Sequence, residues 1–137
     1  MSMLQTQPGA APSNAGTFVP SELFGMLGNL SRADADACDF GVINLDDSGN
    51  VIMVNRYQSE LGGVPVPQFE GKHWFTRIAP CTNNALFYGT FKKGVAAGSM
   101  NVTFNYTFTF KMKPTNVKVH MYRCPNSNTN WAFIAKV

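Results

Sequence analysis

Residues 100–112 alternate between apolar and polar side chains without a break. In the sequence MNVTFNYTFTFKM every second residue is apolar, from Met100 to Met112, and the residues between them are Asn, Thr or Lys. Successive side chains of a β-strand point to opposite faces, so this pattern predicts one long strand with an entirely apolar face. Such a face must be covered by another part of the chain. The segment therefore predicts a sheet that carries a second layer of structure.

Other segments have the composition of shorter strands. Residues 40–45 (FGVINL) and 51–55 (VIMVN) are rich in β-forming residues, and the sequence DDSGN between them contains the residues that a tight turn requires. Two more strands are predicted near residues 115–124 and 130–137, joined by the turn sequence PNSNTN. Consecutive strands joined by short turns pair antiparallel, so the strands predict an antiparallel sheet of five.

Helical patterns precede the strands and separate the second from the third. The sequence PSELFGMLGNLSRADADAC predicts a short amphipathic helix with Ser21 as its N-cap. Asn55 is the predicted N-cap of a second short helix that ends at the glycine pair 62–63, and residues 85–97 predict a longer helix that Gly98 ends. These elements indicate an α+β domain with short helices on one sheet face, an N-terminal helical cap, and a pocket between sheet and helices.

The composition of the chain indicates how it is divided. Residues 1–17 are rich in Pro, Gly, Ser, Asn and Gln, and they predict a flexible tail. The remaining residues, 18–137, predict a single domain with its cap at 18–38 and its core at 39–137.

The charge and hydropathy of the chain exclude several classes of function. A net charge of +3 without basic runs does not favour nucleic-acid binding. No apolar run approaches the roughly 20 residues of a membrane-spanning helix, and no export signal begins the chain, so we expect a cytoplasmic protein. The spacing of Cys38, Cys81 and Cys124 fits neither a disulfide framework nor a zinc site, and no metal is expected.

Cys81 follows Pro80 directly, just before the predicted long helix. Free cysteines commonly serve as small buried apolar residues, and that role remains open. A nucleophilic thiol requires a base, and neither His73 nor His120 lies in a local nucleophile signature. A third role is that of an attachment point for a covalent group in the predicted pocket.

Two longer motifs resemble the photoactive yellow protein family of PAS-domain blue-light receptors. They are DFGVINLDDSGNV and IAPCTNNALFYGTFKKGVAAGSMNVTFNYTFTFKMKPTNVKVHM, and the likeness extends from about residue 24 to the C-terminus. The resemblance implies a PAS fold and a p-coumaroyl (4-hydroxycinnamoyl) cofactor attached to Cys81 as a thioester. It further implies that light isomerises the double bond of this group and that the domain, which is not an enzyme, signals to an unknown downstream protein as a monomer or weak homodimer.

The resemblance also implies a set of pocket residues. The positions that match the family's pocket are Ile43, Val54, Gln58, Gly62, Val64, Trp74, Ile78, Ala79, Thr82, Phe108, Phe110 and Met112.

Five of these positions depart from the family's pattern, and one of them is Phe110, where the family has a tyrosine on the long strand. In the family a tyrosine, a glutamate, a threonine and an arginine surround the buried phenolate, and this chain has Val54, Gln58, Gly62 and Val64 there. We therefore expect the pKa of a bound phenol to be raised by about one unit or more. Tyr57 is one residue out of register, and both Tyr57 and Arg56 are candidates to replace a missing group.

Because these polar residues are missing, a second function is considered, that of a PAS-type sensor of a ligand or partner without photoactivity. A small enzyme that uses Cys81 as its nucleophile is the third.

Overall fold

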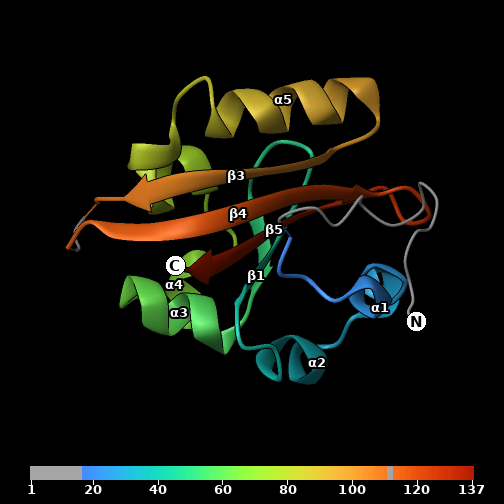
Figure 1. The fold of residues 1–137 in the computed structure, drawn as a ribbon, viewed down its shortest axis with the longest axis horizontal. Helices are drawn as coiled ribbons and strands as arrows, with labels where there is room; N and C mark the ends of the chain where they lie inside the picture. The colour runs from blue at the N-terminus through green and yellow to red at the C-terminus, as the bar shows by residue number, and fades with distance from the viewer. Residues whose placement is uncertain (1–16, 111–112) are drawn as a thin grey trace.

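The computed structural model describes residues 17–110 and 113–137. The predicted flexible tail, residues 1–17, lies outside the described residues apart from Thr17. The described chain forms one antiparallel sheet of five strands in the order β2-β1-β5-β4-β3, which confirms the predicted sheet (Figure 1). The strands are β1 (Gly41–Leu45), β2 (Val51–Val54), β3 (Asn101–Phe108), β4 (Thr115–Cys124) and β5 (Thr129–Lys136).

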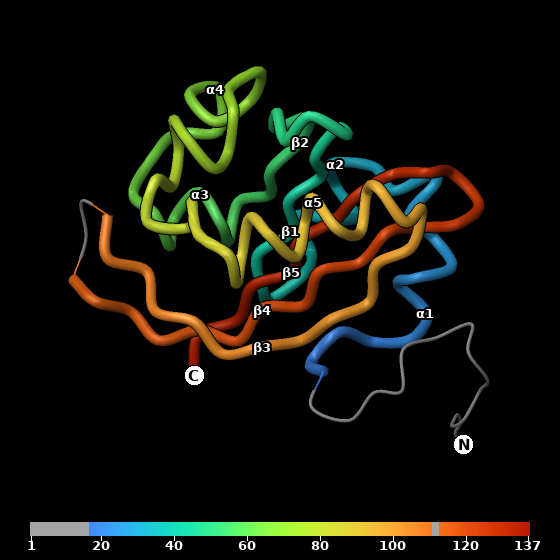
Figure 2. Tube along the Cα trace, turned by 90° about the horizontal axis from the view of Figure 1, so that it is seen from above, coloured from blue at the N-terminus to red at the C-terminus, as the bar shows by residue number. Residues whose placement is uncertain are grey.

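Helices lie on both sides of this sheet. Figure 2 shows α3, α4 and α5 on one side and α1 on the other. The helices are α1 (Ser21–Phe24), α2 (Arg32–Asp36), α3 (Arg56–Gly62), α4 (Val66–Phe69) and α5 (Phe87–Ala97), with short 3₁₀ turns η1 (Leu27–Asn29) and η3 (Pro80–Thr82) and a π-helical turn η2 (Trp74–Ile78). Two apolar cores result, one against the central helices and one against the N-terminal cap.

The N-terminal cap differs in detail from the prediction. A single amphipathic helix is expected there, and the structure has three short pieces, α1, η1 and α2. Ser21 is the first helical residue of α1, and the N-cap position is occupied by Pro20, which makes no side-chain cap. Ser31 forms a capping box with Asp34 at the start of α2, and an N-cap residue there starts a new helix.

Strand β3 is shorter than the alternating pattern predicts. It ends at Phe108, where its last pair with β4 is Phe108↔Thr115. Pro114, which has no backbone N–H, precedes that pair, so the ladder does not extend into the turn. Phe87 at the start of α5 covers part of the apolar face of β3, where its ring contacts the rings of Phe104, Tyr106 and Phe108. Val102 on the same face is 42% exposed.

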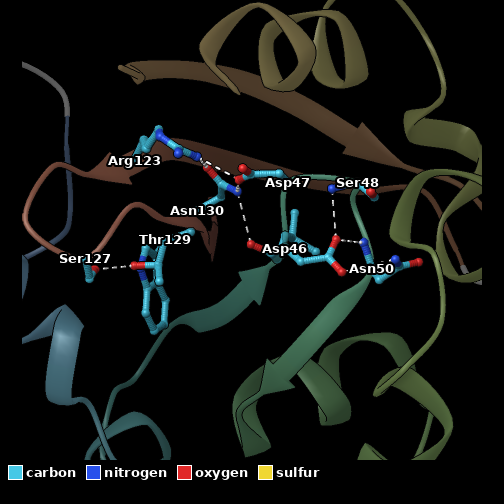
Figure 3. A network of polar contacts seen from close by, with 10 residues as sticks. Asp46, Asp47, Ser48, Asn50, Arg123, Ser127, Thr129 and Asn130 are labelled. Carbon is cyan, nitrogen blue, oxygen red and sulfur yellow. Dashed lines mark hydrogen bonds and ion pairs between the residues drawn. The ribbon is translucent and has the colours of Figure 1, made fainter. Parts of the chain in front are cut away.

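A polar network joins the β1–β2 turn to strands β4 and β5 (Figure 3). The carboxylate of Asp46 accepts hydrogen bonds from the backbone N–H groups of Ser48 and Asn50, both at 2.9 Å. Arg123 donates to Asp47 at 2.8 Å and to Asn130 at 2.7 Å. Side-chain contacts thus join the turn predicted from DDSGN to strand β5, the neighbour of β1, and to strand β4.

No helix in residues 17–110 and 113–137 has both the length and the apolar character that crossing a bilayer requires.

Candidate functional site

A cavity of about 430 Å³ lies between helices α3 and α4, turns η2 and η3, and the end of β3. Its lining residues are Gln58, Leu61, Gly62, Val64, Gln68, Phe69, Lys72, Trp74, Arg77, Ile78, Ala79, Cys81, Phe108 and Phe110. Small-molecule sites typically measure about 300–1,000 Å³ and are mostly apolar with a few polar groups. The cavity has the size and character of such a site.

Cys81 lies half-buried in the wall of this cavity, within turn η3. The turn is held by Thr82, whose backbone N–H and side-chain hydroxyl donate to the Ala79 carbonyl at 2.8 and 2.6 Å. Pro80 fixes a backbone dihedral at the first position of the turn. These features fix the backbone of the turn at Cys81. The thiol therefore has a defined position although it takes no part in these contacts.

Tyr106 on β3 supports the same turn from the sheet side. Its hydroxyl donates to the Cys81 carbonyl at 2.5 Å and accepts from the Asn84 amide at 2.5 Å. Burial raises the pKa of Tyr106, so the hydroxyl stays protonated and remains a donor over the physiological range. Tyr106 therefore anchors the loop that carries the thiol.

Gln58 is placed in the cavity wall by its position in α3. Asn55, the predicted N-cap, accepts the Gln58 backbone N–H at 3.1 Å and the Val42 N–H at 2.9 Å. The Asn55 amide also donates to the carbonyls of Ala35 and Phe40, so α3 is fixed to β1 and to the cap segment. Only 3% of Gln58 is exposed to solvent.

Two polar atoms of cavity-lining residues are buried without a hydrogen-bond partner among the described residues. They are Oε1 of Gln58 and Nε1 of Trp74. The charged residues of the lining are Lys72 and Arg77, and the described lining contains no carboxylate. The cavity therefore favours a neutral or anionic ligand with a hydrogen-bonding group.

The structure brings most of the predicted pocket residues together. The predicted residues that line the cavity are Gln58, Gly62, Val64, Trp74, Ile78, Ala79, Cys81, Phe108 and Phe110. Ile43, Val54 and Thr82 are fully buried and do not line it. Met112 lies outside the described residues.

Neither residue considered as a replacement for the missing polar groups lines the cavity. Arg56 is exposed, and its guanidinium lies 4.0 Å from the carboxylate of Asp36. Tyr57 is half-buried outside the lining, as its position about 100° around the helix from Gln58 predicts.

Several lining residues were missed by the sequence analysis. Leu61 follows Gln58 by three residues, which places both on one face of α3, and this spacing could have identified it. Gln68 and Phe69 belong to α4, a helix that the two prolines of its region concealed. Lys72 and Arg77 carry no motif that the sequence alone would reveal.

The other thiols and the histidines lie away from the cavity lining. Cys124 is buried in the core against the N-terminal cap, and Cys38 is half-buried beside the Asp34 carbonyl. His73 Nε2 is 2.8 Å from the Ser48 carbonyl, and His120 lies between Thr17 and Asn101. Among the described lining residues Cys81 is the only thiol and no histidine is present, so the structure offers Cys81 no histidine base.

The sequence is similar to proteins named photoactive yellow protein. That of Rhodothalassium salexigens is 37% identical over 120 residues, which cover 88% of this chain and 96% of the relative. That of Rhodobacter capsulatus is 30% identical over 104 residues, which cover 76% of this chain and 84% of the relative. No family model matches the chain.

Two solved structures share the fold to different degrees. The photoactive yellow protein domain of the sensor histidine kinase Ppr from Rhodospirillum centenum has a TM-score of 0.78 and 34% identity, covering 82% of this chain and 99% of that one. The PAS domain of the Cronobacter turicensis quorum-sensing receptor RpfR, in complex with BDSF, has a TM-score of 0.60 at 15% identity, covering 73% of this chain and 95% of that one. The second likeness concerns the fold alone, and together they confirm the expected PAS fold.

Proposed function

Because the chain belongs to the photoactive yellow protein family, we propose that it is a blue- or violet-light receptor that carries a p-coumaroyl group as a thioester on Cys81. The observation that carries this proposal is the position of Cys81. It is the thiol that lines the cavity, and the aromatic rings of Trp74 and Phe108 line the same cavity.

The residues present fit such a group. The cavity volume of about 430 Å³ accommodates one aromatic ring with a short chain. Phe69, Trp74 and Phe108 provide rings for it to pack against, and the unpartnered Nε1 of Trp74 provides a donor for a polar atom. Lys72 and Arg77 would favour an anionic oxygen over a cation.

Attachment requires an activated acyl donor such as a p-coumaroyl thioester. The Cys81 sulfur would attack the acyl carbon, forming the new sulfur–carbon bond while the donor's bond to its leaving thiol breaks. The proton of the Cys81 thiol would leave with the departing thiol. The hydrogen bonds of Thr82 and Tyr106 to the turn would hold the sulfur in place during this exchange.

The bound group would supply light absorption and a double bond that isomerises from trans to cis. The residues around the bound group would transmit its change in shape to the rest of the domain. Trp74 and Phe108 belong to one closely packed core, and a close-packed core responds to a change in ligand shape by shifting as a unit. We expect this shift to be read by a downstream signalling protein in the cytoplasm, with the receptor a monomer or weak homodimer and without enzymatic turnover.

A second candidate is a PAS-type sensor of a ligand or partner without photoactivity. The observation in its favour is that Gly62 and Val64 in the cavity wall carry no hydrogen-bonding side chain. A cavity of this size would also suit a free small molecule.

One experiment separates the candidates. Purified protein is incubated with a p-coumaroyl thioester, and its intact mass and visible absorption are recorded in the dark and after illumination. The photoreceptor predicts one acyl adduct, light-dependent bleaching and thermal recovery. Cys81→Ala should abolish the adduct, and the matched control Cys38→Ala should keep it. Protein that stays free of adduct supports the non-photoactive sensor, and steady release of free acid indicates a thioesterase.

A further inference from the structure

Trp74 buries a hydrogen-bond donor that nothing in the described chain accepts. The residue is 2% exposed, it lines the cavity, and its Nε1 has no partner among the described residues. Trp131 provides the contrast within the same chain, because its Nε1 donates to the Thr129 hydroxyl at 2.8 Å. Buried indole N–H groups normally find an acceptor, so the unpartnered one points to an acceptor outside the described residues, such as a bound ligand.

The direction of this N–H is fixed by packing. The Trp74 ring stacks on Phe69 with centroids 6.4 Å apart and an angle of 17° between the rings. It meets Phe108 at 74°, with centroids 6.3 Å apart. Both neighbours line the cavity, so the indole cannot rotate to find another partner without disturbing two walls.

The rest of the lining explains why such a donor is needed. The resemblance implies a tyrosine, a threonine and an arginine at three positions of the pocket. In this chain Val54 is buried and does not line the cavity, and Gly62 and Val64 line it without a hydrogen-bond donor in the side chain. Gln58 offers one amide, whose oxygen lies against the backbone of Gly41. Trp74 is the remaining buried side chain of the lining with an N–H group.

We propose that the Trp74 indole N–H donates a hydrogen bond to the phenolic oxygen of the ring bound in this cavity. The proposal rests on the proposed function and adds a residue that positions the chromophore. The titratable residues of the lining are Lys72, Arg77 and Cys81, and the two cations are partly exposed. Trp74 would therefore take over part of the role of the missing polar residues from another wall of the cavity.

The test uses protein with ¹⁵N-labelled tryptophan, which gives two indole signals because the chain has 2 tryptophans. The spectrum is recorded before and after loading with 4-hydroxycinnamoyl thioester and, separately, with the cinnamoyl thioester that lacks the hydroxyl. Trp74→Phe assigns the signals. We expect the Trp74 signal to move downfield with the hydroxylated group and to stay near its starting position with the other. Trp131 serves as the internal control. Equal movement with both groups would overturn the proposal.

A second readout is the ionisation of the chromophore. In Trp74→Phe the apolar ring is kept and the donor is lost, so the pH of half-ionisation should rise by about one unit. An unchanged value would contradict the proposal.

The two proposals fail in different ways. If no adduct forms on Cys81, the proposed function fails, and the labelled protein is then titrated with free 4-hydroxycinnamate and free cinnamate. A Trp74 signal that responds only to the hydroxylated acid supports the donor assignment. A signal that responds to both or to neither refutes it.

Discussion

The side-chain oxygen of Gln58 lies against the backbone of Gly41, so close that a β-carbon at position 41 would stand 2.2 Å from it. Such a β-carbon would also stand 3.3 Å from the Ile134 carbonyl of the neighbouring strand. The absence of a side chain at Gly41, at the start of β1, thus leaves the space that the Gln58 amide occupies. The relationship links a strand residue outside the cavity to a polar group in its wall.

Gly41→Ala should displace the Gln58 amide, because contacts below 3.0 Å between non-bonded carbon and oxygen are not tolerated. In the loaded receptor we expect a shifted absorption band and an altered recovery rate, with a loss of about 1–3 kcal/mol in the free energy of unfolding. Visible spectroscopy and denaturant unfolding measure the two effects. Gly25→Ala is the control, because a β-carbon there would lie at an ordinary 3.6 Å from the Glu22 carbonyl. An unchanged spectrum in Gly41→Ala would contradict the coupling.

Val64→Arg tests the charge of the cavity. Val64 is half-buried in the cavity wall, where a long side chain can reach the ligand and still contact solvent. A guanidinium near the phenol would stabilise its anion, so we expect the phenol's pKa to fall by about one unit relative to the native protein. Titration of the visible absorption in the dark measures this, with Val64→Met as the uncharged control of similar length. If the native phenol is fully ionised well below neutral pH, the expectation that this chain raises its pKa is wrong.

Gln58→Glu tests the source of protons in the proposed photocycle. The native amide has no acidic proton to give, so any proton that the chromophore gains should come from solvent. A glutamic acid at a site only 3% exposed would have a raised pKa and stay protonated near neutral pH, close enough to donate. We expect changed recovery kinetics, measured by flash absorption. Glu60→Gln, on the exposed face of the same helix, should leave them unchanged. Identical photocycles for Gln58→Glu and the native protein would argue against the role of position 58.

The sheet was predictable because its signals are local. Alternation over residues 100–112, turn residues between strands and glycines after helices each depend on a few neighbouring side chains. The same reasoning placed Asn55 as an N-cap and Gly98 as a helix end, and both are confirmed. It overextended β3, because pattern alone does not show where a partner strand turns away.

The cavity was predictable only in part, because its walls come from segments distant in sequence. The resemblance identified Cys81 and eight further lining residues. Lys72 and Arg77 were not found, since their place depends on how turn η2 folds against α4. The unpartnered Trp74 nitrogen is likewise a property of three-dimensional packing, and no sequence pattern records it.

His120 is buried on the opposite side of the sheet, where it ties the N-terminal segment to strand β3. Its Nδ1 lies 2.6 Å from the Thr17 hydroxyl and its Nε2 lies 2.7 Å from the Asn101 side-chain oxygen. These partners suit a neutral ring whose Nε2 carries the proton. The surrounding rings of Phe24, Tyr122 and Phe133 carry no charge, and burial lowers the pKa of His120 from 6.5 to about 4.

This lowered pKa predicts how stability depends on pH. In the unfolded chain His120 takes up its proton near pH 6.5, and in the folded protein only near pH 4, so acid favours the unfolded state between these values. The contribution is fully present above pH 6.5, falls as the pH drops towards 4, and amounts to at most about 3 kcal/mol. Denaturant unfolding from pH 7.5 to 4 measures it as the difference between native protein and His120→Gln, in which the slope from this residue should vanish. His73→Gln is the control, because it removes the other histidine of the chain, which is only half-buried, and it should keep the slope. A native-like slope in His120→Gln would show that other groups cause the loss of stability in acid.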